Sequence, residues 1–174
     1  MIIKNKSGFI LPPVLIILLI MTLVVLYSMG SSILQEKTSG SLTDKEIAFQ
    51  NSESGLRYVE NYIYANPMPI GLFNPSCLGG YCFPSTTGVP NWETIQWGTD
   101  SLHTIQLPSG TIPKAYAQPK YIIEYLGSAP SSAGQSAKLS SNGTGGGVAY
   151  RITVYAVGER ATTASLVQSI YIKQ

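Results

Sequence analysis

Charged side chains are scarce in this 174-residue chain: Asp, Glu, Lys and Arg make up only 11% of it, whereas about a quarter is usual. The scarcity argues against a disordered acidic or basic tail, and the formal net charge of +2 gives no support for a nucleic-acid partner. Two cysteines allow at most one intrachain disulfide. A single histidine argues against a metal site built from histidines. We expect neither a metal site nor a cofactor.

Catalytic motifs are missing as well. The sequence has no nucleophile elbow, no HExxH and no paired-carboxylate motif, and His103 is the lone histidine. The glycine-rich run at 143–147 lacks the Lys-Ser/Thr that a phosphate-binding loop requires. We therefore interpret His103 as a surface or structural residue and expect a protein that is not an enzyme.

One long hydrophobic run dominates the N-terminal part of the chain. No charged residue occurs between Lys6 and Glu36, and residues 9–29 are almost wholly apolar. A helix over this run would be about 31 Å long, close to the thickness of a bilayer's hydrocarbon core. Two lysines precede the run and the next basic residue is Lys37, which predicts a cytoplasmic N-terminus. We expect residues 9–30 to form a transmembrane helix.

A cleaved secretory signal peptide and a plain uncleaved anchor are two other interpretations of this run. A signal peptide has the same basic start, and a small-x-small site occurs at Ser28-Met29-Gly30. Its apolar core is usually about 7–15 residues long, however, and this run is longer. Helical character also continues through residues 31–35 and, after a break, to about Ala65. A cleaved signal peptide gives no reason for that continuation.

An amphipathic helix is predicted over residues 43–65, after a break at 38–41. The break contains poor helix formers and a glycine, and Thr43-x-x-Glu46 has the pattern of a capping box. Asn66-Pro67 is expected to end the helix, because the residue before a proline avoids the helical region. The side chains expected on its inner face recur at helical spacing and are Ile47, Ala48, Ser54, Leu56, Val59, Tyr62 and Ile63.

Three stretches of the chain together resemble a known family. A short basic leader ends in Gly8, directly before the hydrophobic run that begins at Phe9. Two further blocks consist of Leu34-Gln35-Glu36, Gly40, Leu42, Asp44, Ala48-Phe49-Gln50, Glu53 and Leu56-Arg57, and of Tyr150-Arg151-Ile152-Thr153, Gly158, Arg160 and Leu166-Val167-Gln168-Ser169-Ile170-Tyr171. The leader looks like that of a type IV pilin precursor, and the two blocks are similar to the N-terminal signature and the closing strands of PilX-type minor pilins.

The resemblance implies an α+β type IV pilin fold, with a long N-terminal helix packed on an antiparallel sheet head. Its first half would be a membrane and fibre-core helix, and its second half the amphipathic helix. The implied divisions are a leader peptide at 1–8, a transmembrane helix at 9–30 and a periplasmic head at 31–174. Within the head, we expect the amphipathic helix at about 43–65, a variable region at 66–148 and a C-terminal hairpin at 149–172.

The resemblance also implies how the chain is processed. A prepilin peptidase would cut between Gly8 and Phe9, and the new amino terminus of Phe9 would be methylated. The mature chain would lose Lys4 and Lys6, which leaves equal numbers of basic and acidic side chains. It would reside in the inner membrane as a single-pass protein before it enters the pilus fibre at the cell surface.

By the same resemblance, the chain is a minor pilin that helps to prime and assemble type IV pili, which serve twitching motility, adhesion or DNA uptake. Its partners would be other minor pilins, the major pilin, the prepilin peptidase, the inner-membrane assembly platform and, before assembly, the lipid bilayer. Major pilins carry a glutamate as the fifth residue after the cut, whereas this chain has Pro13 there. That departure suggests a place at or near the pilus tip.

Two alternatives remain open. A minor pseudopilin of a type II secretion system would share the same helix and head in a shorter fibre, although the PilX-like blocks argue against it. A membrane-anchored periplasmic enzyme or binding module would need a polar cleft within residues 70–120, and no catalytic motif supports it.

The head contains three predicted strands and one predicted disulfide. Residues 121–126 are β-rich, and residues 149–157 and 166–172 flank a turn and predict an antiparallel hairpin. Outside the inner membrane thiols meet oxidising conditions, so Cys77 and Cys82 are expected to pair.

The part of the head that least resembles the family contains three aromatic candidates for a surface-binding patch, Tyr81, Trp92 and Trp97. The two tryptophans could instead pack against the long helix.

Overall fold

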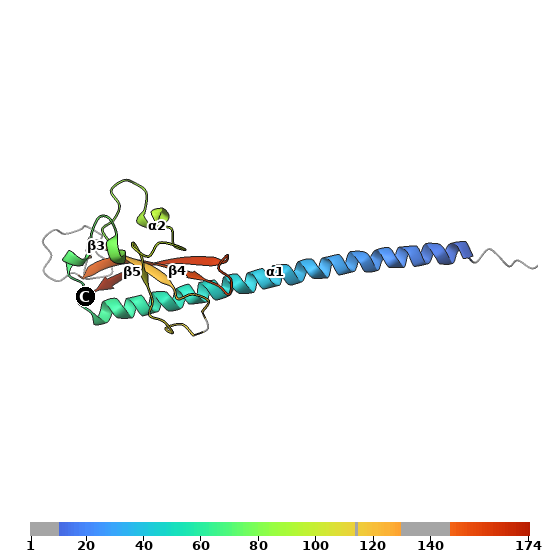
Figure 1. Ribbon diagram of the computed structural model, residues 1–174, viewed down its shortest axis with the longest axis horizontal. Helices are drawn as coiled ribbons and strands as arrows, with labels where there is room; N and C mark the ends of the chain where they lie inside the picture. Colours follow the sequence, from blue (N-terminus) through green and yellow to red (C-terminus); the bar gives the residue numbers. More distant parts are fainter. Residues whose placement is uncertain (1–10, 114, 130–146) are drawn as a thin grey trace, which may run out of the picture. The chain divides into compact units, whose positions relative to one another are not determined.

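The structure is a computed structural model that describes residues 11–113, 115–129 and 147–174, apart from the side chains of residues 28–33. The chain forms two compact units, Met1–Thr43 and Asp44–Gln174. Its architecture is α+β: the long helix α1 (Leu11–Ala65) precedes a five-stranded sheet whose connections carry short helices (Figure 1). This is the fold class that the resemblance implied.

Helix α1 has no break at residues 38–41, so the predicted interruption is wrong. Gly40 costs a helix only about 1 kcal/mol relative to alanine, and the space around it is open. The hydroxyl of Thr38 donates to the carbonyl of Leu34 (2.9 Å), and that of Thr43 donates to the carbonyl of Ser39 (3.0 Å). Thr43 is therefore bonded within a continuing helix and does not cap a new one.

In the first unit, α1 exposes an apolar run from Leu11 to Tyr27. Every side chain from Leu11 to Tyr27 is exposed, and so is every one from Leu34 to Thr43. Over the described residues, no helix is both long and apolar enough to cross a membrane. The transmembrane helix expected at 9–30 includes residues 9 and 10, which lie outside the described residues.

The sheet belongs to the second unit and has the strand order β1-β3-β4-β5, with β2 also paired to β3. The two-residue strand β1 runs parallel to its neighbour β3, and the other pairings are antiparallel, as expected. The strands are β1 (Tyr81–Cys82), β2 (Ile105–Gln106), β3 (Lys120–Ser128), β4 (Val148–Val157) and β5 (Ala164–Lys173). The short helices are η1 (Ile70–Leu72), η2 (Leu78–Gly80) and α2 (Asn91–Thr94).

The C-terminal hairpin predicted from the sequence is present. Strands β4 and β5 pair without a register shift from Val148↔Lys173 to Val157↔Ala164. The connecting turn is closed by the N–H of Gly158, which donates to the carbonyl of Thr163 at 2.9 Å. Strand β3 pairs with the other edge of β4 and contains a bulge between Tyr125 and Gly127.

The core of the second unit fills the space between α1 and one face of the sheet. Leu56, Val59 and Ile63 are buried there, as predicted. Their partners alternate along the strands, because successive side chains of a strand point to opposite faces. The sheet residues of this first cluster are Tyr121 and Ile123 of β3 and Tyr150, Ile152 and Val154 of β4.

The residues on the inner face of α1 are smaller and more polar than predicted. Ala48 is buried and Ile47 is half-buried, but Ser54 is exposed, so its predicted inward position is wrong. Gly55 occupies that face, and a Cβ placed there would lie only 3.0 Å from Cγ1 of Val154 and 3.2 Å from Cβ of Pro119. The glycine therefore lets the helix and the sheet approach closely.

Polar contacts fasten this part of α1 to the hairpin. Asn51 donates from Nδ2 to the carbonyl of Val157 (3.0 Å), and the hydroxyl of Ser169 donates to Oε1 of Glu60 (3.0 Å). At the end of the helix, Nζ of Lys173 donates to the carbonyls of Ile63 (2.6 Å) and Asn66 (2.5 Å). The ammonium group thus satisfies carbonyls that the end of a helix leaves without partners.

Asp44 holds the turn of the hairpin against α1. Its buried Oδ1 accepts the backbone N–H of Glu159 at 2.6 Å and that of Arg160 at 3.3 Å. A Cβ at position 158 would overlap the Asp44 carboxylate, so the approach requires glycine there. The Thr163 hydroxyl, and then the two backbone N–H groups, hold the pKa of Asp44 below its ordinary value.

We predict that Asp44→Asn destabilises the protein at neutral pH but not in acid. A carboxylate whose pKa is lowered by folding contributes stability above its unfolded-state pKa of about 3.9, and that contribution disappears as the pH falls through the folded-state value. Thermal unfolding of the full chain in detergent, followed by circular dichroism, measures the effect.

The exposed neighbour Glu46 provides the matched control. Glu46→Gln should unfold at nearly the same temperature as the unmodified chain at neutral pH, whereas Asp44→Asn should unfold several degrees lower. A deficit of Asp44→Asn that is as large in acid as at neutral pH would contradict the assigned role of the carboxylate.

Candidate functional site

The predicted site residues fall in different parts of the chain. Gly8 and Phe9, the residues of the predicted peptidase site, lie outside the described residues. Pro13 lies in α1 with an exposed side chain. The two cysteines and the three aromatic candidates all belong to the head, which is where the geometry can be followed.

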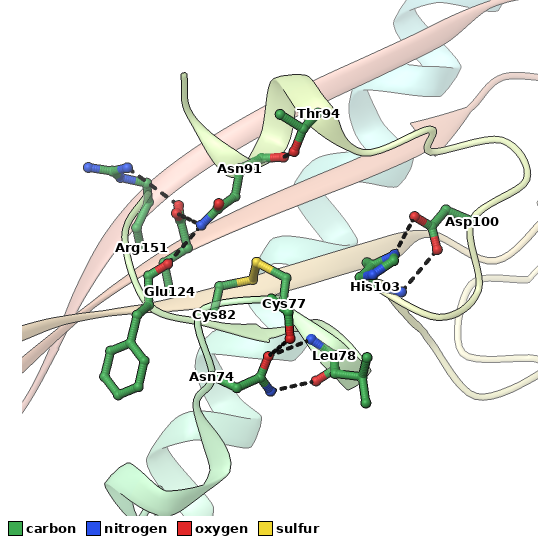
Figure 2. The surroundings of a disulfide bond; sticks show 12 residues. Asn74, Cys77, Leu78, Cys82, Asn91, Thr94, Asp100, His103, Glu124 and Arg151 are labelled. Atoms are coloured by element: carbon green, nitrogen blue, oxygen red, sulfur yellow. Dashed lines mark hydrogen bonds and ion pairs between the residues drawn. A yellow bond between two sulfur atoms is a disulfide. The ribbon is translucent and has the colours of Figure 1, made fainter. Parts of the chain in front are cut away.

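Cys77 and Cys82 form the predicted disulfide, which encloses η2 (Figure 2). Both cysteines are buried, and they pack with Ile122 on the face of the sheet away from α1. Asn74 supports the loop: its Oδ1 accepts the N–H of Leu78 (2.7 Å), and its Nδ2 donates to the carbonyl of the same residue (3.1 Å). The disulfide therefore fixes a local loop onto the sheet.

Trp97 packs on the sheet, so the alternative that it packs against the long helix is wrong. It is only 8% exposed and belongs to a second cluster with Ile122 and Ile95. Its ring stacks on Tyr155 of β4 with centroids 5.7 Å apart, and its Nε1 donates to the carbonyl of Trp92 at 3.0 Å. Two clusters therefore sandwich the sheet, with α1 on one face and the loop of the tryptophans on the other (Figure 1).

The structure does not bring the three predicted aromatics together. Tyr81 is half-buried against the cluster beneath α1, where its hydroxyl lies 3.5 Å from that of Tyr62. Burial raises the pKa of Tyr81. Trp92 and Trp97 lie with the other cluster, so Tyr81 cannot share one patch with them. Successive side chains of β1 point to opposite faces, so Tyr81 faces α1 and Cys82 faces the cluster that contains the tryptophans.

A buried carboxylate that the sequence analysis missed lies on the disulfide side of the sheet. Glu124 of β3 is fully buried, and its Oε1 accepts a hydrogen bond from Nδ2 of Asn91 at 2.8 Å. Its Oε2 lies 3.4 Å from NH1 of Arg151, the residue opposite it on β4 (Figure 2). Arg151 belongs to the PilX-like block, so the structure gives that arginine a role: it neutralises a buried charge.

His103 is tied into a loop. Its Nδ1 lies 2.8 Å from Oδ2 of Asp100, whose Oδ1 accepts the backbone N–H groups of Leu102 and His103 (Figure 2). The backbone N–H of His103 and its imidazole, with the N–H of Leu102, hold the pKa of Asp100 below its ordinary value. These contacts shape the loop, and within the described part of the chain no three His, Cys, Asp or Glu side chains converge as a metal site.

We predict that Arg151→Met destabilises the head by roughly 3 kcal/mol, because it leaves the Glu124 carboxylate buried without its cation. The added change Glu124→Gln should recover part of the loss, since a neutral amide can still accept the hydrogen bond from Asn91. Urea unfolding of the full chain in detergent, followed by tryptophan fluorescence, measures both effects.

Arg57, an exposed arginine of α1, is the control position. Arg57→Met should change the unfolding free energy by less than about 0.5 kcal/mol. The role assigned to the pair would be wrong if the Arg151 and Arg57 variants were equally stable, or if the double variant were less stable than Arg151→Met alone.

Comparison with known proteins gives two matches to family models. The model described as PilX N-terminal matches residues 7–57, and the model described as Type IV pilus assembly protein PilX C-term matches residues 78–173, which is more than half of the chain. No curated protein and no solved structure matches it. The matches span both blocks singled out in the sequence, together with the helix and the sheet that they form. The chain therefore belongs to the PilX family of type IV pilus assembly proteins.

Proposed function

We propose that the chain is a minor pilin that takes part in priming and assembling type IV pili. One observation supports this above the others: a single helix, α1, carries an exposed apolar run in its first part and the inner face of a folded head in its last part. Such a helix can pack against other helices while the head stays folded. The matches to pilus assembly families support the proposal that these other helices belong to pilus components.

The chain is first processed at its N-terminus. A prepilin peptidase cuts between Gly8 and Phe9, and the amino group of Phe9 is then methylated. Removal of the leader takes away Lys4 and Lys6, the only charged side chains before Glu36. The helix then begins with an apolar segment that can leave a bilayer for a fibre.

The apolar run has two successive environments in this proposal. Before assembly, residues 9–30 lie in the inner membrane, with the head in the periplasm. In the fibre, the same side chains are buried among the helices of other minor pilins and the major pilin, supported by the inner-membrane assembly platform. Leu26, Leu34 and Leu42 of α1 are each more than 60% exposed, as expected of a helix surface that another helix covers.

Pro13 supports a place at or near the tip. A carboxylate at this position would form a charge-assisted contact with the amino terminus of a neighbouring subunit, and proline cannot. A subunit without that contact is better suited to begin a fibre than to be inserted along it. Through the pilus, the chain would serve twitching motility, adhesion or DNA uptake.

We predict that Leu19→Asp abolishes the ability of the chain to restore pili in cells that lack it. The substitution places a carboxylate in the apolar run, and a charge at the centre of an apolar helix costs about 3 kcal/mol or more. Electron microscopy and the amount of major pilin sheared from the cells measure pilus assembly, while an immunoblot measures the level of the variant.

Ile70→Asp is the matched control, because Ile70 is 58% exposed in the head and Leu19 is 60% exposed in α1. Ile70→Asp should restore pili to the level of the unmodified chain. If Leu19→Asp also restored them fully, the apolar run would not be the assembly surface. If deletion of the chain left the number of pili unchanged, the proposed function itself would be wrong.

A separate experiment, immunogold labelling, tests whether the chain lies at the pilus tip. A chain tagged after the exposed Gln174 should place immunogold particles at one end of sheared pili. Labelling spread evenly along the fibres would contradict a tip position while leaving the role in assembly intact.

A further inference from the structure

We propose that a cavity in the head binds a single acidic sugar ring. The cavity has a volume of about 170 Å³ and lies between the segment that carries Tyr116, the loop of Trp97 and strand β4. Pockets for drug-sized ligands usually measure about 300–1,000 Å³, so this one suits a smaller molecule. The side chains used in the argument are Trp97, Gln106, Tyr116, Lys120 and Tyr155.

Aromatic rings provide the apolar surface of the cavity. Tyr155 is held by its stacking on Trp97, and the lining residue Tyr116 has 65% of its surface exposed. An exposed aromatic side chain with an apolar body and a polar tip suits a ligand with an apolar face and a hydroxylated edge. A pyranose ring has this combination, because its C–H groups form one face and its hydroxyls lie around the rim.

Lys120 gives the cavity its charge. Its Nζ donates to the carbonyls of Gly98 (3.4 Å) and Asp100 (3.2 Å), and an ammonium group has three donors. Among the described residues no carboxylate lies within ion-pairing distance of it, and the Asp100 carboxylate is engaged by His103. The remaining donor and the positive charge favour a sugar that carries a carboxylate. Nε2 of the exposed Gln106 donates one hydrogen bond to the carbonyl of Gln118 (3.4 Å), which leaves its second N–H and its oxygen for ring hydroxyls.

Hydrogen bonds join the residues on either side of Tyr116 before any ligand arrives. Oε1 of Gln118 accepts the N–H of Ile112 at 3.0 Å, and its Nε2 donates to the carbonyl of the same residue at 3.0 Å. The N–H of Leu107 donates to the carbonyl of Pro119 at 2.9 Å. These bonds fix Ile112, Gln118 and Pro119 in the unliganded protein, so binding requires no further ordering of the backbone at these residues.

Saturation-transfer NMR on the full chain tests the proposal, with a zwitterionic detergent that has no sugar headgroup. The probes are D-glucuronic acid and D-glucose, which differ in the carboxylate. We expect glucuronic acid to bind with a Kd on the order of 1 mM and glucose to bind several times more weakly. Because the measurement uses purified protein, its outcome does not depend on pilus assembly.

Two variants and a control locate the binding. Tyr116→Ala should weaken glucuronic acid binding about tenfold, while Tyr64→Ala, at a 75% exposed tyrosine of α1, should leave it unchanged. Lys120→Gln should bring the affinities for the two sugars together. The proposal is overturned if neither sugar binds, if glucose binds as well as glucuronic acid, or if Tyr116→Ala and Tyr64→Ala behave alike.

Discussion

The head depends on the close approach of α1 to one face of the sheet. Gly55 allows the helix backbone to lie against Val154 and Pro119, so the aliphatic side chains around it can fill the core without a gap. Charged groups then fasten both ends of the contact: Asp44 holds the turn of the hairpin, and Lys173 holds the last helical carbonyls. Without the close contact between α1 and the sheet, the apolar side chains on this face of β3 and β4 would be exposed to solvent.

This arrangement separates folding from assembly. All buried residues of the two clusters lie in Asp44–Gln174, while the described apolar side chains up to Thr43 contribute none of them. The head therefore has its core regardless of what surrounds the apolar run. In the proposed function, that run can exchange lipid for other pilin helices while the sheet, the disulfide and the buried carboxylate remain as they are.

The sequence predicted those parts of the fold that depend on period and propensity. The 3.6-residue period identified Leu56, Val59 and Ile63, and β-branched runs identified the three main strands. The prediction of a break at residues 38–41 was wrong. It relied on the low helix propensity of one exposed glycine and several hydroxyl residues, which is too weak to interrupt a long helix.

The remaining features of the head require long-range pairing, which no local pattern encodes. Glu124 and Arg151 are 27 residues apart in sequence and become neighbours only when β3 pairs with β4. Trp97 and Tyr155 likewise meet only when the loop that carries Trp97 folds onto the face of β4 that carries Tyr155. The disulfide was predictable because its two cysteines are five residues apart and the expected compartment is oxidising.

The mature N-terminus is the most direct test of the central claim that this chain enters a fibre as a processed pilin. It can be read by mass spectrometry of the protein from cells with and without the prepilin peptidase. The account predicts a chain that begins at methylated Phe9 and loses this start when the peptidase is absent. A start at Met1 or Ile2 in both strains, or a start near Gly30, would contradict it.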